Sequence, residues 1–383
     1  KTHGNESMKL KLTAVLLGLL LSVSQFAFAE PFETSLREAF ADDFLVGAAV
    51  NRNQIMGGDP AAMRLAQKHF NTVTPENVMK WEKIEPLEGQ FDWEAADALV
   101  DFAEQHGMEV AGHVLVWHQQ TPDWVFQDAD GNPASRELLL QRMENHINAV
   151  VGRYKGRIAS WEVLNEALNE DGSLRESPWL TIIGEDYIEK AFEWAHAADP
   201  EAKLYYNDYN LYKPEKAAGA RALIESLRQK GLAVHGAGMQ GHYGLDQPGD
   251  LKEFDAAIRA FGQMGLEVYI TELDVSVLPF PPQAEWGADI SVDMELNEKY
   301  NPYADGLPPD VEEKHAARYF KLFKIMQANR NVVDRVTFWG VTDAHSWKNN
   351  WPMQGRTDYT MLFDRDYDPK PVFHRVSVLG KTP

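Results

Sequence analysis

The residues of this sequence that could carry chemistry are glutamates at the ends of two apolar runs. Residues 160–167 read SWEVLNEA, and residues 268–274 read VYITELD. A carboxyl group among aromatic and aliphatic side chains is desolvated, which favours its neutral form and suits a general acid. A second carboxyl group held ionised by hydrogen-bond donors suits a nucleophile, and glycosidic bond cleavage requires these two roles. On position alone, each glutamate could equally be solvated or bonded to a loop amide.

The segments that must position these glutamates are of two kinds. Short apolar runs, typical of strands, alternate with longer segments whose apolar residues recur with the period of a helix. We expect strands at 44–50, 69–74, 109–117, 158–164, 203–209, 235–243, 267–274 and 335–342. We expect helices near 60–68, 93–106, 135–154, 185–198, 214–230, 251–264 and 309–328, with a last one after Pro371. Strand and helix alternating eight times predict an α/β fold, the (β/α)8 TIM barrel, rather than an open doubly wound sheet. The active site of such a barrel lies at the C-terminal ends of its strands, where both glutamates fall.

Composition excludes several classes of function. The chain has 383 residues, 44% of them hydrophobic, which is ordinary for a globular protein. It has no cysteine, so it forms no disulfide, thiolate metal site or cysteine nucleophile. Asp and Glu outnumber Lys and Arg by 58 to 37, giving a formal net charge of -21. We therefore expect no nucleic-acid partner and no anionic membrane surface.

Three of the eleven tryptophans fall at the ends of predicted strands: Trp117, Trp339 and Trp347. An indole face can stack on the apolar face of a pyranose while its N–H meets a hydroxyl group. We expect these three side chains to contact a sugar.

Seven segments in chain order resemble those of a known family. They are 74–81 (TPENVMKW), 112–118 (GHVLVWH), 161–167 (WEVLNEA), 206–210 (YNDYN), 240–242 (QGH), 270–274 (ITELD) and 338–343 (FWGVTD). Together they resemble glycoside hydrolase family 10, the family of retaining endo-β-1,4-xylanases on a (β/α)8 barrel. The resemblance runs from about residue 44 to residue 373, and its motifs stand at seven of the eight predicted strand ends.

The resemblance implies a role for each matching residue. It makes Glu166 the acid/base and Glu272 the nucleophile, in agreement with their expected environments. Asn165 would donate to the sugar 2-hydroxyl, and His242, oriented by Asp274, would keep the nucleophile ionised. The residues that would contact the sugar are Glu76, Asn77, Lys80, His113, Trp117, Gln240, Trp339 and Trp347. The expected substrates are xylan and xylo-oligosaccharides, with no cofactor.

The same residues allow other interpretations. His113, His118 and His242 could bind zinc, but the sequence has no His-x-His pair or His-Glu-x-x-His helix among them, so we expect no metal. The loops at 279–310 and 348–359 are longer than usual for the family, and could restrict the same chemistry to short xylo-oligosaccharides or aryl β-glycosides. A non-catalytic carbohydrate-binding barrel usually lacks one catalytic carboxylate, whereas both are present here.

The first thirty residues predict a secretory signal peptide at 8–29. Two lysines follow Met8, an apolar run spans 12–21, and Ala27-Phe28-Ala29 ends the segment. The apolar run is short for a membrane span, so we expect no membrane contact in the mature form. We expect cleavage after Ala29, then one catalytic domain over 30–383, monomeric and periplasmic or extracellular. Residues 1–7 lie upstream of the expected start methionine.

Overall fold

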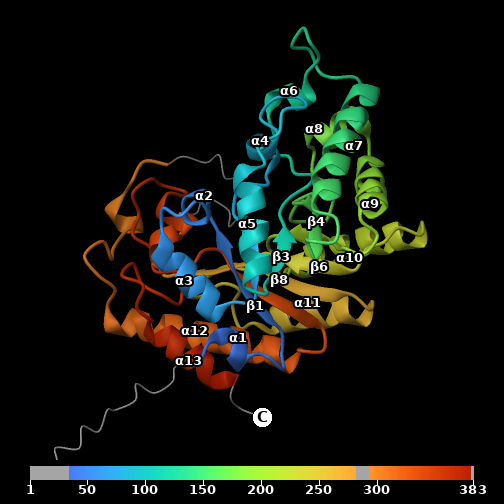
Figure 1. The fold of residues 1–383 in the computed structure, drawn as a ribbon. Coiled ribbons are helices and arrows are strands. Elements are labelled where there is room, and N and C mark those ends of the chain that lie inside the picture. The colour runs from blue at the N-terminus through green and yellow to red at the C-terminus, as the bar shows by residue number, and fades with distance from the viewer. Residues whose placement is uncertain (1–33, 282–293, 381–383) are drawn as a thin grey trace, which may run out of the picture. The chain divides into compact units, whose positions relative to one another are not determined.

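The computed structural model describes residues 34–281 and 294–380, and its centre is a closed barrel of parallel strands (Figure 1). The strands are β1 (Leu45–Val50), β2 (Thr72–Pro75), β3 (Glu109–Gly112), β4 (Ser160–Asn165), β5 (Lys203–Asp208), β6 (Gly236–Met239), β7 (His242–Gly244), β8 (Glu267–Ser276) and β9 (Val333–Phe338). They pair in the order β6-β5-β4-β3-β2-β1-β9-β8, and β6 pairs with β8 to close the ring. The short β7 continues β6 and pairs with the end of β8. The predicted (β/α)8 TIM barrel is confirmed.

Helices cover the outside of the barrel (Figure 1). The longer ones are α3 (Pro60–His69), α5 (Glu94–Gln105), α7 (Arg136–Arg153), α9 (Tyr187–Ala198), α10 (Pro214–Gln229), α11 (Lys252–Gln263), α12 (Pro309–Ala328) and α13 (Pro371–Leu379). Apolar residues three and four apart face the barrel, as Phe254, Ile258 and Phe261 do on α11. The short helices are α1 (Leu36–Ala39), α2 (Arg52–Ile55), α4 (Trp81–Ile84), α6 (Asp123–Phe126) and α8 (Pro178–Ile183). Among the described helices, none is long and apolar enough to cross a membrane.

Three predicted strands are shorter or more divided than expected, each at the mouth of the barrel. The predicted strand 235–243 is split into β6 and β7 at Gly241, whose φ of 87° suits glycine. The predicted strand 109–117 ends at Gly112, and Val116 keeps only an isolated bridge to Leu164. The predicted strand 335–342 ends at Phe338. The chain therefore leaves the hydrogen-bonded ladder where the candidate site residues begin.

The interior of the barrel contains polar side chains that contact one another. Arg335 Nη1 donates to Ser160 Oγ at 2.8 Å, and its guanidinium lies 4.6 Å from the ring centre of Tyr269. Nearer the cleft, a Cβ atom added by substituting Gly238 would lie 2.4 Å from Oδ1 of Asn207. A glycine is required on β6 for the Asn207 side chain to occupy its place on β5, close to the cleft.

Two sequence predictions fall outside the described residues. The signal peptide at 8–29 is one, and residues 282–293 of the long loop at 279–310 are the other. The remainder of that loop is described and contains a short 3-10 helix at Glu298–Tyr300.

Candidate active site

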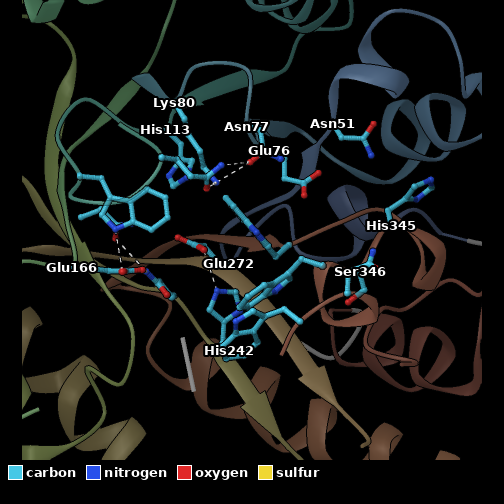
Figure 2. A pocket seen from close by; sticks show the side chains of 18 of the residues that line it. Asn51, Glu76, Asn77, Lys80, His113, Glu166, His242, Glu272, His345 and Ser346 are labelled. Carbon is cyan, nitrogen blue, oxygen red and sulfur yellow. Dashed lines mark hydrogen bonds and ion pairs between the residues drawn. The ribbon is translucent and has the colours of Figure 1, made fainter. Parts of the chain in front are cut away.

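An open cleft of about 640 Å³ lies at the C-terminal ends of the barrel strands. Twelve of the thirteen predicted site residues line it, and the thirteenth, Asp274, contacts His242 from behind. Figure 2 shows Glu166 and Glu272 toward one end of the cleft, and Asn51, His345 and Ser346 toward the other. The twelve are Glu76, Asn77, Lys80, His113, Trp117, Asn165, Glu166, Gln240, His242, Glu272, Trp339 and Trp347.

Glu166 follows β4 directly and is almost completely buried. Its Oε2 accepts a hydrogen bond from Trp117 Nε1 at 3.0 Å, and its Oε1 accepts one from Gln240 Nε2 at 2.9 Å. Burial, together with the negative charges of Asp208 and Glu272, raises the pKa of Glu166 to about 8 in spite of these two hydrogen bonds. The carboxyl group is therefore protonated at neutral pH and can donate a proton.

Glu272 lies on β8, equally buried but in a different electrostatic setting. Its Oε1 accepts from Asn207 Nδ2 at 2.9 Å, and its Oε2 lies 3.0 Å from His242 Nε2. Burial acts to raise the pKa of Glu272, but the hydrogen bond and charge of His242, together with Lys80, hold that pKa below its ordinary value. This carboxyl group is ionised at neutral pH, as a nucleophile must be.

His242 connects Glu272 to a second carboxylate. Its Nδ1 lies 2.9 Å from Asp274 Oδ2, and the same oxygen accepts from Trp347 Nε1 at 2.8 Å. Burial acts to lower the pKa of His242, but the charges and hydrogen bonds of Asp274 and Glu272 raise it to about 9. At neutral pH the ring is a cation that donates from both nitrogens, which fixes its orientation and keeps Glu272 ionised.

Lys80 organises the part of the cleft formed after β2. Its Nζ donates to Asn77 Oδ1 at 2.9 Å and to Gln120 Oε1 at 2.8 Å, and lies 5.2 Å from the ring centre of Trp117. Burial lowers the pKa of Lys80, whereas it raises the pKa of the neighbouring Glu76. This arrangement offers both donors and acceptors to the hydroxyl groups of a neutral sugar.

The buried pair of His113 and Glu162 was not assigned a joint role from the sequence. His113, which lines the cleft, has its Nδ1 2.9 Å from Oε2 of Glu162, which is buried and does not line the cleft. Among the described residues, the one group that could hold a metal ion is His113, Glu162 and Glu272, with ligand atoms within 4.8 Å of one another. This group includes neither His118 nor His242, so it is not the cluster of His113, His118 and His242 considered as a zinc site above.

Two of the three predicted sugar-binding indoles use their N–H groups within the protein. Trp117 Nε1 donates to Glu166 and Trp347 Nε1 donates to Asp274, so these two N–H groups have partners within the protein. In each case a buried carboxyl oxygen lies within hydrogen-bond distance of the indole nitrogen, at 3.0 Å for Trp117 and at 2.8 Å for Trp347. Both ring systems still line the cleft, as does Trp339, which packs edge-on against His113 with ring centres 5.1 Å apart.

Several residues that line the cleft had no counterpart among the sequence predictions. Asn51 directly follows β1 and His345 lies just after β9, and pairing of β1 with β9 brings these distant parts of the chain together. His345 is held by Asp59 at 2.8 Å and by Thr342 at 2.9 Å. The one signal available in the sequence was their position after predicted strands. The others are Gln120, Ala344 and Ser346, whereas Asn350, Trp351 and Gln354 also line the cleft and belong to the long loop at 348–359 noted in the sequence.

A (β/α)8 barrel whose mouth holds one carboxyl group with a raised pKa and one with a lowered pKa has the two groups that a glycoside hydrolase requires. The sequence profile of glycosyl hydrolase family 10 matches residues 35–378, so the chain belongs to this family. The predicted family is confirmed.

Relatives named as xylanases match the chain over nearly their whole length. Endo-1,4-β-xylanase A of Xylanibacter ruminicola is 44% identical over 367 residues, covering 96% of this chain and 98% of that protein. The endo-1,4-β-xylanase of Geobacillus stearothermophilus is 43% identical, covering 89% of this chain and 97% of that protein. The solved structure of a family 10 endoxylanase from a sugarcane soil metagenome has 43% sequence identity and a TM-score of 0.87, covering 90% of this chain and 100% of that one. A mutant structure solved in complex with xylotriose has 38% sequence identity and a TM-score of 0.80, covering 90% of this chain and 99% of that one.

Proposed function

We propose that this protein is an endo-1,4-β-xylanase that hydrolyses internal bonds of xylan by a retaining double displacement. The observation that carries the proposal is the contrast between two buried carboxyl groups: the pKa of Glu166 is raised to about 8, and that of Glu272 is lowered. The xylan specificity is supported by relatives named as endo-1,4-β-xylanases and by the neighbour solved with xylotriose.

In the first step, the Glu272 carboxylate attacks the anomeric carbon while Glu166 gives its proton to the departing glycosidic oxygen. Asn165 Oδ1 accepts from Gln240 Nε2 at 3.1 Å and from Asn207 Nδ2 at 3.3 Å. The Nδ2 end of the Asn165 amide is then available to donate to the sugar 2-hydroxyl, an interaction that strengthens in the oxocarbenium-like transition state.

In the second step, Glu166 acts as a base. The ester bond to Glu272 removes that residue's negative charge, which had contributed to the raised pKa of Glu166. Glu166 therefore becomes more acidic once the intermediate has formed. As a carboxylate it takes a proton from water, the water oxygen attacks the anomeric carbon, and Glu272 is released.

The substrate contacts we propose follow the walls of the cleft. Glu76, Asn77 and Lys80 would bind hydroxyl groups of the glycone, with His113 next to them. Trp347 and Trp339 would stack their ring faces on the sugars of the glycone. Trp117 and Gln240 would hold Glu166 beside the bond that is cleaved. None of these contacts requires a metal or cofactor, and we expect full activity after treatment with a chelator.

A time course of products from polymeric xylan and xylohexaose tests this function, with cellohexaose as a specificity control. We expect xylan to yield a ladder of oligomers that later collapses to xylobiose and xylose. Cleavage of short oligomers alone would instead show that the long loops restrict the cleft. Glu272→Ala should abolish turnover, whereas measurable activity of this variant on xylan would refute the mechanism.

Export and oligomeric state are proposals from the sequence. We propose that residues 8–29 direct export and are removed, leaving Glu30 as the first residue, and that the mature enzyme is a monomer. Mass spectrometry of the enzyme from cell fractions and culture fluid gives the N-terminus and the compartment, and light scattering gives the mass. A cytoplasmic protein that retains residues 8–29 would contradict export.

A further inference from the structure

The backbone of Glu166 adopts a conformation that residues with a Cβ rarely take. Its φ is 55°, in the left-handed region. Neighbouring structure must therefore hold it in place. Its N–H donates to Asn207 O on the adjacent strand at 3.0 Å, which fixes one side of the residue.

Arg175 fixes the other side. Its Nε donates to the carbonyl oxygen of Glu166 at 2.9 Å, and its Nη2 donates to Leu168 O at 3.3 Å and to Tyr209 Oη at 2.6 Å. One guanidinium thus joins the carbonyl of Glu166, the following loop and the segment after β5. Lysine, with a single nitrogen, has no planar set of donors to reproduce this geometry.

The loop at 167–174 folds back on itself and places Arg175 beside Glu166. The Arg175 N–H donates to Ala167 O at 2.8 Å, and Leu168 pairs with Leu174 as an isolated antiparallel bridge. Asn169 N also donates to Ser173 O at 2.8 Å. Arg175 does not line the cleft, so it can act on the substrate only through another residue.

We propose that Arg175 is a positioning residue that holds the left-handed backbone of Glu166 and so aims its carboxyl group at the glycosidic oxygen. This proposal rests on the proposed acid/base role of Glu166. Small displacements of a catalytic group cost as much as 100-fold in rate, and a positioned general acid contributes about 100-fold or more. The loss of rate on replacing Arg175 should be greatest for substrates whose leaving group must be protonated as it departs.

The test compares Arg175→Met with wild type on two aryl β-xylobiosides. The phenyl glycoside has a leaving group that needs the proton, and the 2,4-dinitrophenyl glycoside has one that does not. We expect kcat/KM, which reports glycosylation, to fall about 10- to 100-fold on the first and less than about threefold on the second. Arg221→Met is the matched control, because Arg221 also donates to a backbone carbonyl, that of Ala217 on α10, away from the site.

Two further variants, Arg175→Lys and Glu166→Ala, complete this test. Arg175→Lys should show a smaller loss with the same preference between substrates, and it replaces Arg175→Met if melting shows that variant to be unfolded. Equal losses on both glycosides, or no loss on either, would overturn the proposal. Glu166→Ala should show the same preference more strongly and should be accelerated by azide, whereas Arg175→Met should not. A Glu166→Ala variant without that preference would refute the acid/base assignment itself.

Discussion

The raised pKa of Glu166 makes the folded protein less stable as pH rises. Between the ordinary value of 4.5 and about 8, the folded chain keeps a proton that the unfolded chain has released. Each pH unit in this interval is worth about 1.4 kcal/mol, and stability falls wherever the folded state binds more protons. The wild type should therefore lose as much as about 5 kcal/mol from this group on going from acidic to alkaline pH.

Glu166→Gln removes the titration and keeps the shape of the side chain. The amide has one oxygen for the two donors, Trp117 Nε1 and Gln240 Nε2, so the variant has a fixed cost of about 1–3 kcal/mol at every pH. Comparing the variant with wild type at pH 5 and again at pH 9 cancels this fixed cost. The stability of the variant relative to wild type should rise by about 3–5 kcal/mol between these pH values.

Urea unfolding followed by tryptophan fluorescence measures this quantity, since urea leaves electrostatic interactions unscreened. Glu225→Gln, at an exposed position of α10, is the control and should show no such rise. The wild-type kcat/KM should also fall above about pH 8, as Glu166 loses its proton. A variant whose relative stability is the same at pH 5 and pH 9 would refute the argument that burial keeps Glu166 protonated.

Three further predictions concern groups around the pair. Asn207→Ala removes a donor to Glu272 and should raise the acidic limb of the kcat/KM profile by about one pH unit; an unmoved limb would contradict the role of that hydrogen bond. Trp347→Phe keeps a ring but removes the N–H that donates to Asp274, so kcat should fall about tenfold while KM changes less than in Trp347→Ala. Lys80→Met should raise KM for xylotriose about tenfold or more, and a loss confined to kcat would show that Lys80 does not bind the glycone.

The barrel and the position of two buried glutamates at its mouth were predictable from local pattern, whereas the roles of Glu166 and Glu272 were implied only by the family resemblance. Strand and helix periods alternate along the chain, and Glu166 and Glu272 stand where β4 and β8 meet the cleft. The strand ends were less predictable. Gly241 divides one expected strand through a left-handed φ, which the apolar pattern of 235–243 does not reveal.

Contacts between side chains of neighbouring strands could not be predicted from the sequence. Asn207 lies within a recognised segment, but its bond to Glu272 needs the space that Gly238 leaves on the next strand. His113, which follows β3, and Glu162 on β4 are buried partners, and neither segment alone indicates their pairing. The directions of indole N–H groups depend likewise on which acceptor the fold places nearest.

The most direct test of the central claim is to trap the covalent intermediate. A 2,4-dinitrophenyl 2-deoxy-2-fluoro-β-xylobioside has an activated leaving group, and its fluorine slows both steps, so the glycosyl-enzyme should accumulate. Peptide mass spectrometry should find one fluoroxylobiosyl group on the peptide that contains Glu272, with no label on Glu272→Ala. A label on Glu166, or continued turnover of xylan by an enzyme that never becomes labelled, would contradict the double displacement through Glu272.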